Sequence, residues 1–162
     1  MDIELTLQVS DWLYQEADLL DQGRFQDWLK LMDPDVHYYA PVRQNLYQNS
    51  LDSEMRIFEE NLRTLTLRVE RLYTEFAWAE SPPSRTRHNI TNIRVRSEAD
   101  GVVAAQSNFI FVRSRGEDAA SDVLSGQRED TLRRTADGFM LLERRIVLDQ
   151  SVLAVKNVAF FL

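Results

Sequence analysis

The sequence predicts an α+β domain in which three helices in the first half pack on a strongly curved, mainly antiparallel sheet. Two observations support this fold class: apolar residues recur at helical spacing in the first half, and long runs rich in β-branched and alternating residues fill the second. Helices followed by strands are typical of α+β proteins. Since no repeat, low-complexity segment or linker interrupts the chain, we expect a single domain spanning residues 1–162.

The helices are predicted from apolar spacing and from the residues that end them. The first ends at Gly23, which suits the left-handed conformation found after helices. The second spans residues 25–32 and ends at Asp33-Pro34, because proline disfavours helical geometry in the residue before it. The third is "NLRTLTLRVERLYTEF", which stops near Pro82 and Pro83. The apolar positions are Leu5, Val9, Trp12, Leu13 and Leu20, then Phe25, Trp28, Leu29 and Met32, then Leu62, Leu65, Val69, Leu72 and Phe76.

The strands are predicted from β-branched and aromatic runs bounded by turn residues. "VHYYAPV", residues 36–42, is a short strand in which Pro41 indicates an edge or a bulge. The run "NITNIRVRSEADGVVAAQSNFIFVRSRG" is a hairpin, because Asp100-Gly101 is a dipeptide that tolerates the positive φ of a tight turn. "DVLSGQREDTLRR" and "FMLLERRIVL" follow as two further strands. Together they predict an antiparallel meander.

Composition disfavours several classes of function. With 26 acidic and 19 basic residues the formal net charge is −7, which repels nucleic acids and anionic membranes. The chain has no cysteine, so it offers no thiolate for catalysis, zinc or an iron–sulfur cluster. No apolar run approaches the ~20 residues that cross a bilayer, and the first residues lack the pattern of a secretion signal. We therefore expect a cytoplasmic protein with neither nucleic-acid nor membrane partners.

The two histidines, His37 and His88, are the natural candidates for metal binding. Non-haem oxygenase iron commonly takes two histidines and a carboxylate, but neither histidine lies at helical ligand spacing from a carboxylate. The sequence also lacks a glycine-rich phosphate loop and a G-x-S-x-G elbow. We expect no metal, cofactor or catalytic site on this chain, and a structural, hydrogen-bonded role for His88.

One enzymatic alternative stays open. Helices closing over a curved sheet would form a cone whose mouth could hold a histidine–aspartate acid–base pair, with His88 and either Asp21 or Asp35 as the candidates. Such a pair would make the chain a stand-alone dehydratase or isomerase.

The arginines of the second half favour either a hydrated sheet face or a subunit contact. They would form cross-strand pairs with Glu98, Glu129, Asp130 and Glu143. Arginine is also common at protein interfaces, because its planar guanidinium can grip a carboxylate in a fork. The arginines in question are Arg85, Arg87, Arg94, Arg96, Arg113, Arg115, Arg128, Arg133, Arg134, Arg144 and Arg145.

Three segments together resemble the small, or β, subunits of aromatic-ring-hydroxylating dioxygenases. They are "LLDQGRFQDWLKLMDPDVHYYAPVR", "TLTLRVERLYTEFAWAESPPSRTRHNITNIRV" and "GQREDTLRRTADGFMLLERRIVLDQ". The middle segment is the most specific, since it joins a helix, a double proline, the S-R-T-R-H run and a strand without a gap. The resemblance implies a nuclear-transport-factor-like cone, which agrees with the fold class derived above.

The resemblance also implies a division of labour between subunits. A large α subunit would carry a Rieske [2Fe–2S] cluster and a mononuclear non-haem iron, with electrons delivered from NADH by a reductase. The β chain would form a trimer beneath an α trimer, in a complex of three α and three β subunits. The complex would convert an aromatic ring to a cis-dihydrodiol. The short chain length favours the benzoate, toluate or anthranilate subtype, and thus an aromatic carboxylate as the substrate.

The resemblance further implies structural or subunit-contact roles for particular residues. His88 and its neighbouring arginines would order the strand and the contacts between subunits. The end of the sequence, "SVLAVKNVAFFL", is apolar and must be buried, either in this domain or against a neighbouring subunit. The candidate residues are Arg85, Arg87, His88, Asn92, Phe160, Phe161 and Leu162.

Overall fold

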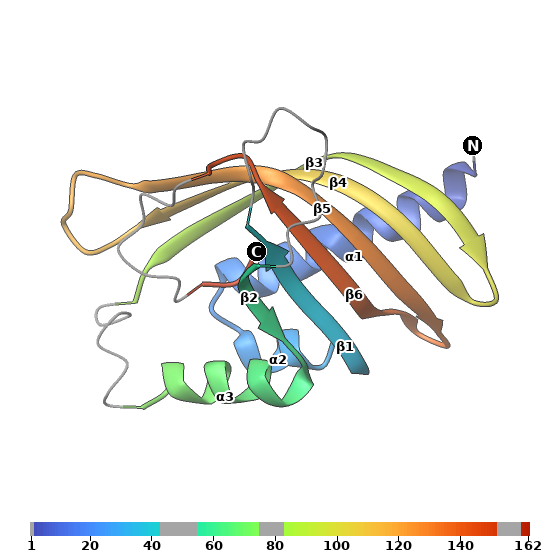
Figure 1. Cartoon of the computed structure of the whole chain (residues 1–162), viewed down its shortest axis with the longest axis horizontal. Helices are drawn as coiled ribbons and strands as arrows, with labels where there is room; N and C mark the ends of the chain where they lie inside the picture. Colours follow the sequence, from blue (N-terminus) through green and yellow to red (C-terminus); the bar gives the residue numbers. More distant parts are fainter. Residues whose placement is uncertain (1, 43–54, 75–82, 152–159) are drawn as a thin grey trace.

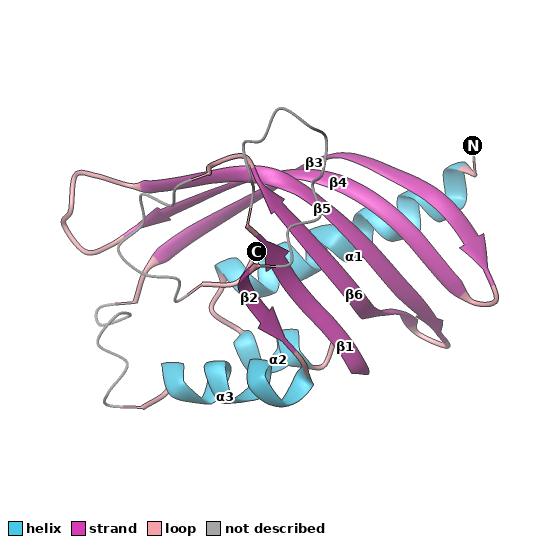
Figure 2. Cartoon of the chain, in the orientation of Figure 1, coloured by secondary structure: helices cyan, strands magenta, loops and turns pink. Residues whose placement is uncertain are grey.

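The computed structural model describes residues 2–42, 55–74, 83–151 and 160–162 of the 162-residue chain. Within these ranges, six strands form one sheet in the order β2-β1-β6-β5-β4-β3, and three helices lie beside it (Figure 1). The sheet curves over the longest helix, α1, while α2 and α3 lie near the β1–β2 edge (Figure 2). The α+β class and the mainly antiparallel sheet are thus confirmed, with β1 and β6 as a parallel pair.

Helix α1, Ile3–Asp21, begins at an Asp2 cap whose carboxylate accepts a hydrogen bond from the Leu5 N–H at 3.0 Å. After it, Gly23 has φ +69°, the left-handed conformation predicted for a helix end. The predicted apolar positions of α1 are buried, and the Trp12 indole donates to the Phe139 carbonyl at 2.9 Å. This bond ties the helix to β6, Gly138–Leu148. None of the helices in the described ranges is long and apolar enough to cross a membrane.

The second helix is shorter than predicted. Helix α2 spans only Phe25–Leu29, and Met32 begins strand β1, Met32–Pro41, so the prediction that the helix extends to Met32 is wrong. The chain leaves the helix because it bonds to β6: the Leu141 N–H donates a hydrogen bond to the Leu31 carbonyl at 2.8 Å. Pro34, which has no backbone N–H, is tolerated in the strand. It lies between Met32 and His37, where the β1–β6 pairing is irregular.

The third helix, α3, Leu62–Leu72, opens with a capping box between Asn61 and Thr64. The continuation predicted through Phe76 lies outside the described residues. Strand β2, Arg56–Glu60, was not predicted; it pairs antiparallel with β1, and the register shifts between Ala40 and Pro41. The prediction of an edge or a bulge at Pro41 is therefore confirmed.

The predicted meander is confirmed. Strands β3, Arg85–Ala99, β4, Val102–Ser114, β5, Asp122–Thr135, and β6 pair antiparallel in chain order. Asp100 and Gly101 both adopt positive φ, 51° and 74°, as a tight turn requires. In β4 and β5 buried and less buried residues alternate, so one face of each strand lines the core beneath the curved sheet.

Candidate functional site

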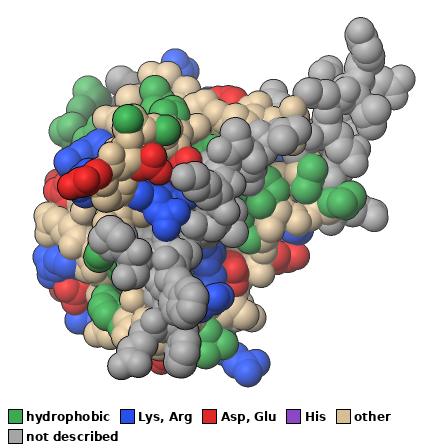
Figure 3. Space-filling view, turned by 90° about the vertical axis from the view of Figure 1, so that its left-hand side faces the viewer, with side chains coloured by type: hydrophobic (Ala, Val, Ile, Leu, Met, Phe, Trp, Pro, Cys, Tyr) green, Lys and Arg blue, Asp and Glu red, His purple; other side chains and the backbone are tan. Residues whose placement is uncertain are grey.

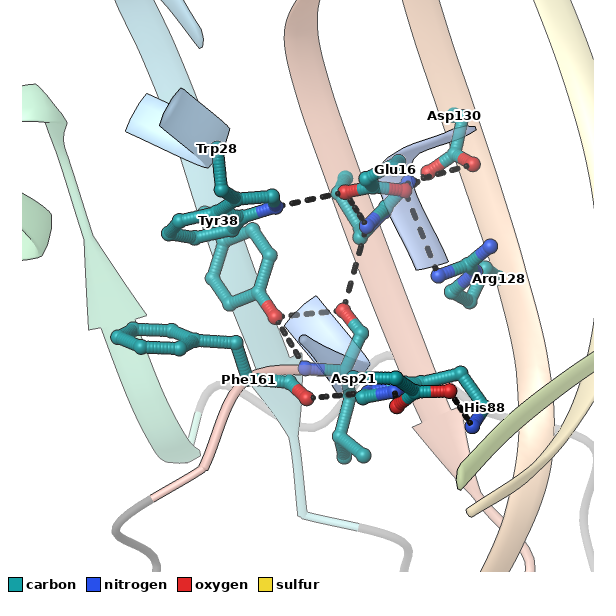
Figure 4. Close-up of polar contacts among 10 residues, drawn as sticks. Glu16, Asp21, Trp28, Tyr38, His88, Arg128, Asp130 and Phe161 are labelled. Atoms are coloured by element: carbon teal, nitrogen blue, oxygen red, sulfur yellow. Dashed lines mark hydrogen bonds and ion pairs between the residues drawn. The ribbon is translucent and has the colours of Figure 1, made fainter. Parts of the chain in front are cut away.

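Two predicted residues, Asp21 and His88, meet in the structure. Asp21 is the last residue of α1, and His88 lies on β3 with its side chain turned inward. The His88 ring Nδ1 is 2.5 Å from Asp21 Oδ1, and the His88 backbone N–H donates to Asp21 Oδ2 at 3.0 Å (Figure 4). The other carboxylate proposed as a partner, Asp35, is an exposed residue of β1 and makes no such contact.

The second ring nitrogen of His88 is also occupied. Nε2 lies 2.9 Å from the carbonyl oxygen of Phe161, and the ring packs against Phe111 with centroids 4.9 Å apart. Both ring nitrogens therefore face acceptors, a carboxylate and a main-chain carbonyl, and both contacts are satisfied only when both nitrogens carry hydrogen. This arrangement leaves no free nitrogen on His88 to accept a proton from a substrate.

The ionised form of Asp21 is stabilised by the same contacts. Burial opposes ionisation, but the hydrogen bonds from the His88 ring and backbone, the charge of His88 and the Thr86 hydroxyl outweigh it and lower the pKa of Asp21. Arg87 adds little, because its guanidinium is 3.9 Å from Asp21 and 73% exposed.

A second cluster of charges is buried under the sheet, and sequence analysis did not find it. Glu16 of α1 accepts from Arg144 of β6 at 2.6 and 2.8 Å, and Arg144 also bonds Asp130 of β5 at 2.7 and 3.1 Å (Figure 4). Arg128 completes the cluster, with Nη1 3.7 Å from Glu16. Two carboxylates thus oppose two guanidinium groups, so the buried charges balance.

The electrostatics of this cluster depend on burial and on pairing. Burial opposes ionisation of Glu16, yet the charges of Arg144 and Arg128 and the hydrogen bonds from Arg144 and Trp28 lower its pKa to about 2. Burial likewise opposes the charge of Arg144, but Asp130 and Glu16 raise the pKa of Arg144 above its ordinary value. For Arg128, burial and the nearby charge of Arg144 lower the pKa.

For three of the eleven arginines, the structure corrects the prediction of a hydrated face or a subunit contact. Arg113, Arg128 and Arg144 are all about 1% exposed or less, and each pairs inside this chain. The signal was present in the sequence: Arg128 and Asp130 are two apart in a strand and share a face, and Glu16 lies within the apolar stripe of α1. By contrast, cationic and anionic side chains are interspersed on the face of the molecule that Figure 3 shows.

The last residues of the sequence connect the two polar groups. The Tyr38 hydroxyl donates to the Leu162 oxygen at 2.5 Å and accepts from the Leu162 N–H at 2.7 Å, while Arg144 donates to the same oxygen at 3.3 Å. Since the neighbouring Phe161 carbonyl faces His88, a chain of polar contacts runs from Asp21 to Glu16 (Figure 4).

The candidate residues at the end of the sequence lie within the core of this chain. The Phe161 ring lies 4.5 Å from Trp28 between centroids, and the Phe160 ring lies 5.0 Å from Phe111. Together with Leu162 they are at most 8% exposed. Residues 152–159 of the predicted apolar segment lie outside the described residues.

The remaining candidates lie at the surface of β3. Arg85 donates to the Gly116 carbonyl at 3.0 Å, and Arg87 extends into solvent. Asn92 has φ +52° where the register between β3 and β4 shifts, so it forms part of a bulge. The structure does not gather these three residues with His88 into one site.

The donor set of this chain does not fit an iron site or a Rieske cluster. A Rieske centre takes cysteine and histidine ligands, and the sequence has no cysteine. His37 and His88 lie on β1 and β3, with β6, β5 and β4 between them in the sheet. Among the described residues, no group of three histidine, aspartate or glutamate side chains is placed to hold a metal ion.

Comparisons with known sequences find relatives along nearly the whole chain. A family model described as "Ring hydroxylating beta subunit" matches residues 15–155. Benzene 1,2-dioxygenase subunit beta from Pseudomonas putida strain F1 is 35% identical over 167 residues, covering 98% of this chain and 89% of the relative. Biphenyl 2,3-dioxygenase subunit beta from Rhodococcus jostii strain RHA1 is 35% identical over 170 residues, covering 99% and 90%.

Solved structures extend the agreement. A chain of naphthalene 1,2-dioxygenase with indole bound in the active site matches with a TM-score of 0.88 and 27% identity, over 100% of this chain and 88% of that one. A protein described as a scytalone dehydratase from Novosphingobium aromaticivorans matches with a TM-score of 0.71 at 14% identity, over 98% and 93%, and so shares the fold alone. The fold is nuclear-transport-factor-like, and the chain belongs to the family of ring-hydroxylating dioxygenase β subunits.

Proposed function

We propose that this chain is the non-catalytic small subunit of the terminal oxygenase in an aromatic-ring-hydroxylating dioxygenase. The observation that carries the proposal is the 35% identity to two dioxygenase β subunits over almost the whole chain. The geometry supports a non-catalytic role. In the most enzyme-like pair, Asp21 and His88, both ring nitrogens of His88 already have partners, Asp21 and the Phe161 carbonyl.

The proposed partner is a large α subunit that carries the Rieske cluster and the mononuclear iron, with electrons supplied from NADH through a reductase. The donor set of this chain supports placing both metal centres on the partner, since the sequence has no cysteine and only two histidines. We further propose that three copies of this chain associate as a trimer within a complex of three α and three β subunits. Arg85 and Arg87 are then candidates for contacts between subunits, because they lie at the surface.

We propose an aromatic hydrocarbon as the substrate of the complex. The two relatives above are named for benzene and biphenyl. Their identity extends over almost the whole chain, whereas the aromatic carboxylate was favoured only by the length of the chain. The carboxylate prediction stays the alternative.

Coexpression with the large-subunit gene and product analysis tests the proposal. The complex is expected to form cis-dihydrodiols from biphenyl or naphthalene, and the large subunit alone is expected to be less stable and less active. Preferential turnover of benzoate or anthranilate would instead support the carboxylate subtype. Metal analysis of this chain alone is the matched control: stoichiometric iron on it would overturn the non-catalytic assignment.

The second candidate function, a dehydratase or isomerase, is favoured only by the 2.5 Å contact between His88 and Asp21. It requires His88 to release Phe161 before it can act as a base. A reaction catalysed by the isolated chain and lost in His88→Gln, with assembly unchanged, would support it over the subunit role.

A further inference from the structure

A cavity of about 380 Å³ opens beside Asp21 and has no part in the proposed function. It lies where the end of α1, the end of α3 and the start of β3 come together. Most of its described wall is apolar, and four phenylalanine rings contribute to it. The apolar side chains that matter here are Leu20, Phe25, Leu72, Phe111, Phe160 and Phe161.

The size and lining of the cavity suit a flat ring system. An apolar cavity of about 150 Å³ is enough to bind benzene, so this one has room for two fused rings. Aromatic walls favour aromatic guests, because offset and edge-to-face contacts add to the burial of apolar area. Cavities of this size that are mostly apolar, with a few convergent polar groups, are typical of small-molecule sites.

The polar part of the wall includes Asp21, Thr86 and His88, and the lining also contains Gln22, Tyr73 and Ser84. Asp21 Oδ1 accepts from Thr86 at 3.0 Å and from the His88 ring, whereas Oδ2 accepts only the His88 N–H among the hydrogen bonds described. A carboxylate oxygen accepts two hydrogen bonds, so Oδ2 retains capacity for one donor. His88 offers nothing further, since both of its nitrogens are engaged.

The charge of this wall selects against anions. No lysine or arginine lies among the described residues that line the cavity; outside its lining, the Arg87 guanidinium is 3.9 Å from Asp21 Oδ2, on a side chain that is 73% exposed. A guest with a hydroxyl donor therefore gains a charge-assisted hydrogen bond to Asp21, whereas a guest with a carboxylate loses that bond and finds no lysine or arginine among the described lining residues to pair with.

We propose that this cavity is a binding site for a neutral one- or two-ring aromatic molecule that carries a hydroxyl group, held by the phenylalanine rings and by a hydrogen bond to Asp21. The site is proposed to bind its guest without reacting with it. The proposal does not depend on the proposed function, since it concerns this chain alone.

Calorimetric titration of the full chain at neutral pH with 2-naphthol and with 2-naphthoate tests the proposal. The two probes share a ring system and differ in charge and in the donor. We expect saturable binding of 2-naphthol with one site per chain, and binding of 2-naphthoate weaker by at least about tenfold, the ratio that corresponds to about 1.4 kcal/mol for the lost hydrogen bond to Asp21. No saturable binding of 2-naphthol would overturn the proposal, and equal affinities would overturn the role of Asp21.

Variants locate the site. Leu72→Trp fills the cavity and is expected to weaken 2-naphthol binding at least about tenfold, the loss expected when a pocket is blocked by bulk. Leu67→Trp is the matched control, because Leu67 is an exposed residue on the same helix that does not line the cavity. Asp21→Asn removes the negative charge and is expected to reduce the difference in affinity between 2-naphthol and 2-naphthoate. Equal loss in the Leu67 and Leu72 variants, or an unchanged affinity in Leu72→Trp, would contradict the assignment.

Discussion

The buried charges around Arg144 and the exposed pair of Arg134 with Glu98 use the same chemistry in two environments. The shortest nitrogen–oxygen distance is 2.7 Å both for Arg144 with Asp130 and for Arg134 with Glu98. The Arg144 and Asp130 side chains are at most 1% exposed, whereas those of Arg134 and Glu98 are 39% and 38% exposed. Equal distances therefore do not imply equal contributions to stability.

The difference arises from what each charge loses when its partner is removed. In the exposed pair, water takes the place of the partner, so such pairs contribute little. In the interior, the remaining carboxylates would keep a charge without compensation in a medium of low polarity. Removing one member of the interior cluster is therefore expected to cost more stability than removing one member of the exposed pair.

The largest effect is expected for Arg144→Met. The substitution keeps most of the side-chain volume but leaves Glu16 and Asp130 without their main partner, so it should cost about 3–5 kcal/mol of unfolding free energy. Urea denaturation with a two-state fit measures this loss. A cost below about 1 kcal/mol would mean that the interior behaves like the surface.

Phe161→Ala is expected to have a similar or slightly smaller effect, a loss of about 3–4 kcal/mol of unfolding free energy. The substitution removes the ring that packs on Trp28 and Phe25 and leaves a cavity in the core. Tyr73→Ala, at a side chain that is largely exposed, is the control and should stay within about 0.5 kcal/mol. Thermal unfolding combined with sedimentation separates the two roles considered for this segment. An intact, equally stable chain that fails to form trimers would show that Phe161 acts between subunits.

The stability of the folded chain is expected to fall between pH 4.5 and about pH 2. Because the pKa of Glu16 is lowered from 4.5 to about 2, the unfolded state binds more protons than the folded state in this window, and acid favours unfolding. The contribution of Glu16 is fully present above pH 4.5 and amounts to roughly 3 kcal/mol. In Glu16→Gln, the unfolding free energy measured by denaturation should depend less on pH across this range. Some dependence should remain, because the pKa of Asp21 is also lowered. An unchanged profile would exclude Glu16 as its main source.

His88→Gln should cost about 1–2 kcal/mol, since an amide cannot satisfy Asp21 and Phe161 as the imidazole does. Activity of the reconstituted oxygenase per assembled complex is expected to be unchanged. His37→Gln is the matched control, because His37 is a half-exposed residue paired with Glu59 at the surface. Comparable losses of unfolding free energy in both variants would show that the buried His88 contributes no more to stability than the exposed His37.

The smallest effect is expected for Arg134→Met, about 1 kcal/mol or less, and it should shrink further as salt is added. Parallel denaturation of the Arg144 and Arg134 variants at low and high ionic strength gives the sharpest form of the comparison. Equal salt dependence in the two would contradict the difference in burial.

Most of the fold could be predicted because its signals are local. The alternation of β4, β5 and β6 and the positive φ of Asp100 and Gly101 follow from residue types a few positions apart. Helix α1 follows from its apolar stripe for the same reason. The error after α2 had the opposite cause: residues 30–32 have helical spacing, but a main-chain bond from Leu141 draws the chain into the sheet, and a contact 110 residues away leaves no local signal.

The sequence alone determined the fold class, the family and the pairing of His88 with an aspartate as a possibility. Only the tertiary structure decided which aspartate pairs, since Asp21 and His88 are 67 residues apart. It also decided which arginines are buried. Alternation shows that Arg128 and Asp130 share a face, but a strand has two faces, and only the packing of α1 against the sheet brings Glu16 to Arg144, 128 residues away. Local spacing fixes the direction of a side chain relative to its own backbone, whereas burial and ion pairing depend on what the rest of the chain places opposite it.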